Sequence, residues 1–340
     1  MFHRNNLKWL VNRRSFLRTS LAGIPLALAA DHAVSADDSK PSNVGDQAVQ
    51  KVRDRMKGPM ASITMPYNKD YSIDHGALRG WVDYMCEKKI PILFLTYGDS
   101  ELYNLNAQEI EAVIRTVAGQ ARGRSLVTGG TPRGWTGRLV DFINRLEDSG
   151  VDAVSVHLYT QNEEEIYRAL SQVSDKTRLP LLAYESKWSV GLVKRVAQIP
   201  RFVGMKCHAE LYRYYDFIRT TKEHGFGVLS AGQMKHFLFG YLIGSPAYLC
   251  PLAPFAPEVA LRFYQSLTKG DILAARQVVF DYEEPLLKHT GLLGYPHAYK
   301  SALYLTGHFK TNLMRHPKHT NTMQEIEPLR KFFKQKEIVE

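Results

Sequence analysis

The reactive chemistry in this sequence is concentrated around a lysine that follows a run of apolar residues. Residues 202–208 read Phe-Val-Gly-Met-Lys-Cys-His, which predicts a buried strand ending at Lys206 and His208. Burial disfavours the ammonium form and lowers the pKa of a lysine, so its free amine can attack a carbonyl carbon. The alternative is an ordinary strand-end lysine whose ammonium group reaches water.

A tyrosine ends the preceding apolar run, residues 179–184. Alternate residues of a strand share a face, so Leu182 and Tyr184 point the same way, as do Gly204 and Lys206 on the next strand. If these faces meet, the Tyr184 phenol lies beside the Lys206 amine. Such a pair is suited to imine chemistry, because the phenol shuttles protons while the amine adds to a ketone. The imine then acts as an electron sink, so that a C–C bond can form or break.

The elements that would position these residues alternate regularly between short apolar strands and amphipathic helices. Strands are predicted at 61–66, 91–97, 125–130, 153–158, 179–184, 202–208, 226–230 and 247–250. Helices are predicted from Asp74 and over 107–119, 136–148, 163–174, from Val190, 211–223, 234–243 and 256–268. Eight strand–helix units of this kind predict a parallel sheet closed into a (β/α)8, or TIM, barrel.

The alternative for such a pattern is an open doubly wound sheet, which usually has a glycine-rich phosphate turn after its first strand. Residues 66–70 read Pro-Tyr-Asn-Lys-Asp, so the closed barrel is preferred. We therefore predict an α/β fold with the barrel over residues 58–270. A C-terminal helical extension, residues 271–340, would hold helices at 271–289, 296–306 and 325–335 packed outside the barrel.

Active sites of TIM barrels collect at the C-terminal ends of the strands. Six residues near those ends, besides Lys206 and Tyr184, are predicted to bind substrate. They are Gly98, Asp99, Ser100, His157, His208 and Ser230.

The N-terminus has the order of features of an export signal. Residues 12–18 read Asn-Arg-Arg-Ser-Phe-Leu-Arg and resemble the twin-arginine motif, and an apolar stretch and the small residues 34–36 follow. We predict a signal peptide over residues 1–36, a linker over 37–57 and a periplasmic location. The apolar stretch is too short for a permanent membrane anchor.

Charge and composition point to a small anionic substrate. The net charge is +10, of which residues 1–36 contribute +4. The remaining +6 includes no dense basic run with interleaved aromatic residues, so a nucleic-acid partner is not predicted. A modest positive field suits an anionic small molecule.

Taken in order and with their spacing, these segments resemble the dihydrodipicolinate synthase / N-acetylneuraminate lyase family. The resemblance covers about residues 58–290 and includes 66–70, 101–105, 150–154, 179–184 and 203–206. It implies class I aldolase chemistry on a 2-oxo acid, with Lys206 as the Schiff-base lysine and Tyr184 as the proton-relay tyrosine. It also implies no metal or organic cofactor, and a homo-oligomer, either a tetramer or a dimer.

Three positions depart from the pattern of the family. Tyr97-Gly98-Asp99-Ser100-Glu101 replaces the Gly-Thr-Thr-Gly-Glu loop that holds the substrate carboxylate, and Asp99 would repel that carboxylate. The arginine expected shortly after Tyr184 is absent, and Tyr159-Thr160 stands where the synthase has a second tyrosine after the fourth strand. These changes argue against dihydrodipicolinate synthesis itself. They favour a Schiff-base lyase that acts on another oxo acid, such as a sugar acid.

Two other functions remain open from the sequence. Asp99, His157, Glu185 and His208 lie near the same predicted rim and would suit a metal-dependent lyase or hydrolase, although no tight metal motif is present. A non-catalytic relative that binds oxo acids is the other alternative, and Asp99 is the feature that supports it.

Overall fold

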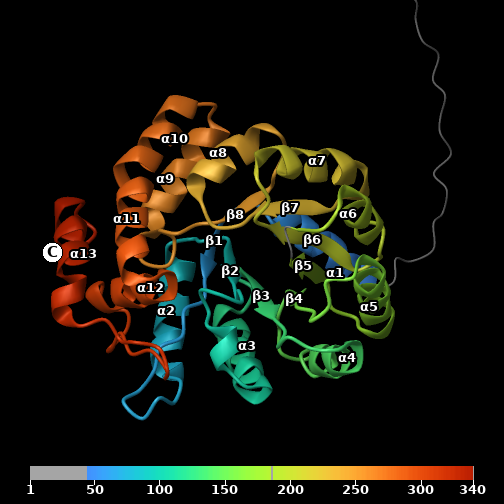
Figure 1. Cartoon of the computed structure of the whole chain (residues 1–340), viewed down its shortest axis with the longest axis horizontal. Coiled ribbons are helices and arrows are strands. Elements are labelled where there is room, and N and C mark those ends of the chain that lie inside the picture. Colours follow the sequence, from blue (N-terminus) through green and yellow to red (C-terminus); the bar gives the residue numbers. More distant parts are fainter. Residues whose placement is uncertain (1–43, 185–186, 340) are drawn as a thin grey trace, which may run out of the picture. The chain divides into compact units, whose positions relative to one another are not determined.

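Eight parallel strands form a closed barrel in the computed structural model, which describes residues 44–184 and 187–339 (Figure 1). The strands are β1 Gly58–Ser62, β2 Ile92–Phe94, β3 Leu126–Gly130, β4 Ala153–Val156, β5 Leu181–Tyr184, β6 Phe202–Cys207, β7 Gly227–Ser230 and β8 Ala247–Leu249. The helices around them are α2 His75–Glu87, α3 Ala107–Ala121, α4 Thr136–Asn144, α5 Glu163–Lys176, α6 Val190–Val196, α7 Leu211–Thr221, α8 Met234–Leu242 and α9 Pro257–Thr268. The predicted (β/α)8 barrel is confirmed, with strands somewhat shorter than the sequence indicated.

Local signals in the sequence fix where several helices begin. The Asp74 carboxylate accepts a hydrogen bond from the Ala77 N–H, which caps α2 as its position before the helix predicted. Asn106 and Glu109 form a reciprocal capping box at the start of α3. These caps fix the loops that lead from β1 and β2 into their helices.

Helix α1, Val44–Arg55, occupies part of the range predicted to be a linker. Val49 and Val52 of this helix, and Met56 just after it, are buried in one cluster with residues of all eight strands, such as Leu182 and Leu229. The helix therefore closes one end of the barrel interior. The spacing of 49, 52 and 56 places these side chains on one helical face, and the polar composition around them hid this signal. The predicted signal peptide lies outside the described residues.

An irregularity in β6 changes which residues of that strand face the interior. Leu181 pairs with Phe202, whereas Leu182 pairs with Gly204, so β6 has one extra residue at this point. As a result Val203 joins the interior cluster, although simple alternation from Lys206 predicts that it faces the helices. A Cβ atom at Gly204 would lie 2.3 Å from the Gly227 carbonyl oxygen, so the glycine allows β7 to approach.

The C-terminal segment forms α10 Ile272–Val278, a π-helical turn Val279–Glu283, α11 Glu284–Leu293, α12 Tyr295–Leu305 and α13 Met323–Gln335. These helices gather on one side of the barrel near α2 and α9 (Figure 1). They were predicted to pack outside the barrel, but α12 also brings Tyr295 to the barrel mouth. Among the described residues, no helix combines the length and apolarity needed to cross a membrane.

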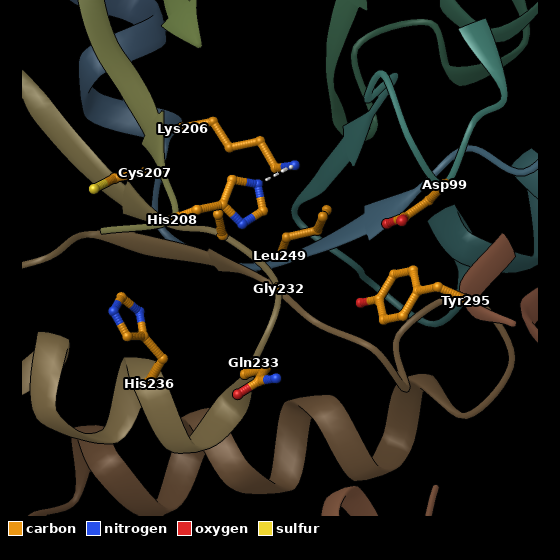
Figure 2. A pocket seen from close by; sticks show the side chains of 10 residues that line it. Asp99, Lys206, Cys207, His208, Gly232, Gln233, His236, Leu249 and Tyr295 are labelled. Carbon is orange, nitrogen blue, oxygen red and sulfur yellow. Dashed lines mark hydrogen bonds between the residues drawn. The ribbon is translucent and has the colours of Figure 1, made fainter. Parts of the chain in front are cut away.

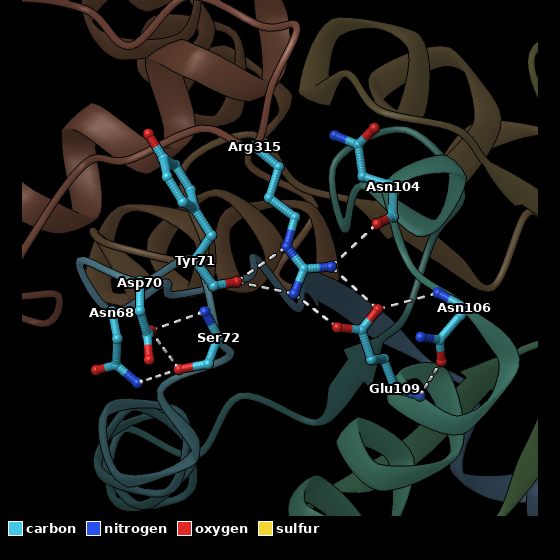
Figure 3. Close-up of polar contacts among 8 residues, drawn as sticks. All are labelled: Asn68, Asp70, Tyr71, Ser72, Asn104, Asn106, Glu109 and Arg315. Atoms are coloured by element: carbon cyan, nitrogen blue, oxygen red, sulfur yellow. Dashed lines mark hydrogen bonds and ion pairs between the residues drawn. The ribbon is translucent and has the colours of Figure 1, made fainter.

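Arg315 ties the C-terminal segment to the loops after β1 and β2 (Figure 3). Its guanidinium donates to both carboxylate oxygens of Glu109, at 2.6 and 3.0 Å. It also donates to the Tyr71 and Asn104 carbonyl oxygens. A planar bidentate pair of this kind fixes orientation as well as distance. The loop that carries Asp99 is therefore held between α3 and the C-terminal segment.

Candidate active site

Lys206 reaches from β6 into the mouth of the barrel and is almost fully buried, with 3% of its surface exposed. Its Nζ atom donates hydrogen bonds to Thr96 Oγ1 at 2.9 Å and to His208 Nε2 at 3.1 Å. Burial lowers the pKa of Lys206 to about 8, although the nearby Asp99 carboxylate acts in the opposite direction. A larger fraction of the amine is therefore uncharged near neutral pH than in an ordinary lysine, although the ammonium form still predominates.

Tyr184 lies directly across from Lys206, because the two residues are paired in the register of β5 and β6. The Lys206 Nζ atom is 4.9 Å from the centre of the Tyr184 ring. The Tyr184 ring also packs edge-on against His157 and His208, with ring centres 5.0 and 5.9 Å apart. The predicted juxtaposition of Lys206 and Tyr184 is therefore present.

Asp99 faces Lys206 from the opposite wall (Figure 2). Burial raises the pKa of Asp99 to about 6, while the Lys206 ammonium and a hydrogen bond from Ser62 oppose the shift. The pKa of Asp99 lies below that of Lys206. At a pH between these two pKa values, Asp99 is mainly a carboxylate and Lys206 is mainly an ammonium group. The buried carboxylate therefore stabilises the charged form of the lysine.

Asp99 and Lys206 open onto a cavity of about 330 Å³, whereas Tyr184 lines a separate small pocket together with His157. The residues that form its wall come from β6, β8, the loops after β2 and β7, and the starts of α8 and α12. They are Asp99, Lys206, Cys207, His208, Ala231, Gly232, Gln233, His236, Leu249 and Tyr295. Figure 2 shows the Asp99 carboxylate and the Tyr295 hydroxyl pointing into the space in front of Lys206 and His208. The cavity is large enough for a small organic acid.

The other predicted substrate-binding residues lie elsewhere. His157 is buried beside Tyr184 and lines a separate small pocket. Gly98 is exposed, and the Ser100 hydroxyl accepts a hydrogen bond from the Thr96 N–H at 3.0 Å. Ser230 is fully buried behind the cavity wall. Gly98, Ser100 and Ser230 are thus not part of the wall formed by the residues that the structure describes.

Ser230 nevertheless fixes a residue that does line the cavity. His236 Nε2 donates to the Ala209 carbonyl oxygen at 3.1 Å, so its Nδ1 is unprotonated and accepts the Ser230 hydroxyl proton at 2.7 Å. Burial lowers the pKa of His236, which keeps the ring neutral. His236 was not predicted as a site residue, because its position in the helix predicted at 234–243 gave no indication that it turns toward the site.

Tyr295, Gln233 and Thr96 were also missed. Thr96 lies two residues after the end of β2, just before the 97–101 loop that was compared with the family pattern, and its hydroxyl accepts a hydrogen bond from the reactive nitrogen. Tyr295 belongs to the C-terminal extension, and its hydroxyl accepts a hydrogen bond from Tyr299 at 2.8 Å. The Tyr295 proton is therefore available to a group in the cavity. No sequence signal relates residue 295 to residue 206, because tertiary packing alone brings α12 to the barrel mouth.

The loop after β2 is anchored by a fully buried ion pair between Glu101 and Lys300. Glu101 has a left-handed backbone conformation, with φ of 53°. The Lys300 ammonium also lies 4.0 Å from the centre of the Tyr67 ring, on the loop after β1. Burial lowers the pKa of Lys300 to about 8, against the effect of Glu101. This pair fixes the position of Asp99, two residues before Glu101.

The structure brings together fewer potential metal ligands than the sequence suggested. His157 Nδ1 donates to the Thr131 carbonyl oxygen at 3.0 Å, and Glu185 lies outside the described residues. Within residues 44–184 and 187–339, no group of three or more His, Cys, Asp or Glu side chains is arranged to hold a metal ion.

A comparison with known protein families decides the classification. Residues 55–336 match the model of the dihydrodipicolinate synthetase family. The chain belongs to this family. The match covers the barrel and most of the C-terminal helices, so the predicted family resemblance is confirmed.

Curated relatives of this chain are distant in sequence. A probable 5-dehydro-4-deoxyglucarate dehydratase from Streptomyces avermitilis is 27% identical over 250 residues, covering 70% of this chain and 75% of that protein. An uncharacterised DapA-like lyase from Thermococcus kodakarensis is 26% identical over 292 residues, covering 80% and 96%. These relatives support a lyase of this family and leave the reaction open.

Solved structures of the family show the same fold. The dihydrodipicolinate synthase of Oceanobacillus iheyensis superimposes with a TM-score of 0.78 at 17% identity, covering 86% of this chain and all of that chain. The E. coli K12 prophage protein YagE, solved in complex with pyruvate, gives a TM-score of 0.77 at 20% identity, covering 83% and 99%.

Proposed function

We propose that this protein is a Schiff-base-forming lyase or aldolase acting on a 2-oxo acid, either pyruvate or a sugar acid. Lys206 adds to the ketone, Tyr184 assists proton transfer, and the imine permits formation or cleavage of a C–C bond. The observation that carries the proposal is the buried Lys206 amine, of lowered pKa, which lines the cavity and lies 4.9 Å from the centre of the Tyr184 ring. No step of this chemistry requires a metal or an organic cofactor.

The substrate class follows from the family and from the cavity. YagE was solved with pyruvate, and the Streptomyces relative is named for 5-dehydro-4-deoxyglucarate. The Asp99 carboxylate and the Tyr295, Gln233 and His236 side chains supply polar groups beyond the reacting carbon. These polar groups suit a substrate that carries hydroxyl groups better than they suit pyruvate, which has no hydroxyl substituent. We propose a hydroxylated oxo acid as the physiological substrate.

Reductive trapping tests the proposal. The purified protein is incubated with pyruvate, 5-dehydro-4-deoxyglucarate and other 2-oxo acids, reduced with borohydride, and analysed by intact-protein and peptide mass spectrometry. We expect one stable adduct per chain, located on Lys206. A folded protein that forms no adduct with any acid would contradict imine chemistry and favour a non-catalytic or metal-dependent role.

Asp99→Asn is expected to shift the pH dependence of imine formation. The Asp99 carboxylate raises the pKa of Lys206, so its removal lowers that pKa and frees the amine at lower pH. The pH at which the trapping rate rises should therefore be lower by about 1 unit than in the native chain. The concentration of oxo acid giving half-maximal trapping should fall by roughly tenfold, because a like charge is removed.

The measurement is the trapping rate between pH 5.5 and 9.5 at several substrate concentrations. Asp148→Asn is the matched control, since the Asp148 side chain is 80% exposed and pairs with Arg115 on the surface. An unchanged profile in Asp99→Asn would show that the Asp99 carboxylate has no electrostatic effect on Lys206.

We also propose that the protein is exported to the periplasm and acts as a homo-oligomer. The twin-arginine sequence at residues 12–18 supports export. In a bacterial host with an intact twin-arginine pathway we expect a periplasmic product beginning at Asp37, and Arg13→Lys/Arg14→Lys should retain it in the cytoplasm. Sedimentation velocity of the mature chain measures the subunit number.

A further inference from the structure

The imidazole of His208 is the feature that the proposed function leaves unused. It follows Lys206 by two residues, just beyond the end of β6, and lines the same cavity. Figure 2 shows its ring beside the Lys206 chain, with one nitrogen directed at Nζ. That nitrogen is Nε2, 3.1 Å from Nζ. The contact is therefore made to the atom that would attack a substrate.

The direction of this hydrogen bond fixes the protonation of the imidazole. A lysine nitrogen donates in its ammonium form, so His208 Nε2 must present a lone pair. The ring proton then resides on Nδ1. His208 is exposed at the mouth of the cavity, and partial desolvation, the Lys206 charge and His236 all lower its pKa, so the ring is neutral near neutral pH. A neutral imidazole with its basic nitrogen toward the reactive amine is the arrangement of a proton acceptor.

Tyr184, which the proposed function already gives a part in proton transfer, lies with its ring centre 4.9 Å from Nζ, and the hydroxyl groups around Nζ are less suited to accept a proton than His208. Thr96 Oγ1 lies 2.9 Å away, but a hydroxyl is a very weak base. The Ser100 and Ser230 hydroxyls are engaged with the Thr96 N–H and with His236. Thr96 and His208 both accept a hydrogen bond from Nζ, and of these two His208 is the one with a basic nitrogen.

We propose that His208 is a catalytic residue that carries protons between the Lys206 nitrogen and the substrate oxygen during imine formation. This inference rests on the proposed function. When the amine adds to the ketone, nitrogen becomes positive and oxygen negative. His208 Nε2 takes one proton from nitrogen and returns it to oxygen, which gives the neutral carbinolamine.

A second transfer in the same direction completes the step. His208 takes the remaining N–H proton, whose bonding electrons form the C=N bond, and delivers it to the hydroxyl group as the C–O bond breaks. Water leaves, the imine remains, and His208 ends neutral.

The test compares rates of imine formation in two His208 variants. Pyruvate is mixed with each protein and the reaction is quenched with borohydride at timed intervals. His208→Gln keeps a hydrogen-bond acceptor for Nζ but cannot carry a proton, and His208→Ala removes both properties. We expect both variants to accumulate the adduct 10²- to 10⁴-fold more slowly, within the usual range for general acid–base catalysis. The final yield should be unchanged.

Chemical rescue separates proton transfer from positioning. Free imidazole should accelerate His208→Ala in proportion to its concentration and should have little effect on His208→Gln, whose side chain fills the space. His224→Gln is the control, because His224 precedes β7 at the opposite end of that strand from the site. Its adduct rate should equal that of the native chain.

Three results would overturn parts of this scheme in different ways. A native rate in His208→Gln would overturn the inference alone. A slow His208→Ala variant that imidazole does not accelerate would assign His208 a positioning role and also overturn it. Absence of any adduct in the native protein would overturn the proposed function and this inference together.

Discussion

Lys206→Met is expected to abolish the borohydride-stable adduct and to lower turnover of any oxo acid by at least about 10³-fold. The substitution keeps an unbranched chain of similar length in a buried position but removes the nucleophilic nitrogen. Thr96 and His208 lose a shared partner, and neither can form an imine in its place. Trapping and turnover are measured on the same preparation, with the adduct located by peptide mass spectrometry.

Lys222→Met is the matched control, because Lys222 is exposed in the short helix before β7. It should trap and turn over like the native chain. Thermal unfolding of Lys206→Met establishes that the variant is folded. An adduct that persists in folded Lys206→Met would place the imine on another lysine and would remove the basis of the proposed function.

Lys300→Met is expected to lower the free energy of unfolding by about 3–5 kcal/mol, the usual cost of breaking a buried ion pair from one side. Lys300 and Glu101 are both 0% exposed, so the remaining carboxylate has no access to water. The variant also loses the contact between the ammonium group and the Tyr67 ring. Because Glu101 follows Asp99 by two residues, we also expect slower trapping at Lys206.

Equilibrium denaturation in urea measures the stability change, and Glu101→Gln/Lys300→Met tests its cause. Removing both charges should recover most of the loss, since the cost comes from the uncompensated carboxylate. Lys310→Met is the control: Lys310 pairs with Asp74 but its side chain is 81% exposed, so a change below about 1 kcal/mol is expected. If the double variant is as unstable as Lys300→Met, the lost free energy of unfolding comes from altered packing and not from the uncompensated carboxylate.

The sequence by itself determined the barrel and its central residues. The apolar residues of strands and of amphipathic helices repeat with different periods, so each segment indicates its own secondary structure. Eight strand–helix repeats predict a (β/α)8 barrel, and the structure has that closed barrel. Strand periodicity and the rule that barrel sites form at the strand ends were enough to place Lys206 beside Tyr184. The same reasoning placed His208 and Asp99 at the cavity.

Tertiary structure alone decided the rest of the site. The extra residue in β6 turned Val203 inward, and a bulge of this kind follows from how β5, β6 and β7 pack. Packing of α12 against the barrel mouth brought Tyr295 to the cavity and Lys300 to Glu101. Residues separated by about 200 positions carry no local signal of their contact, because side-chain periodicity reports only the face of one element. Their meeting depends on where whole helices settle against the barrel.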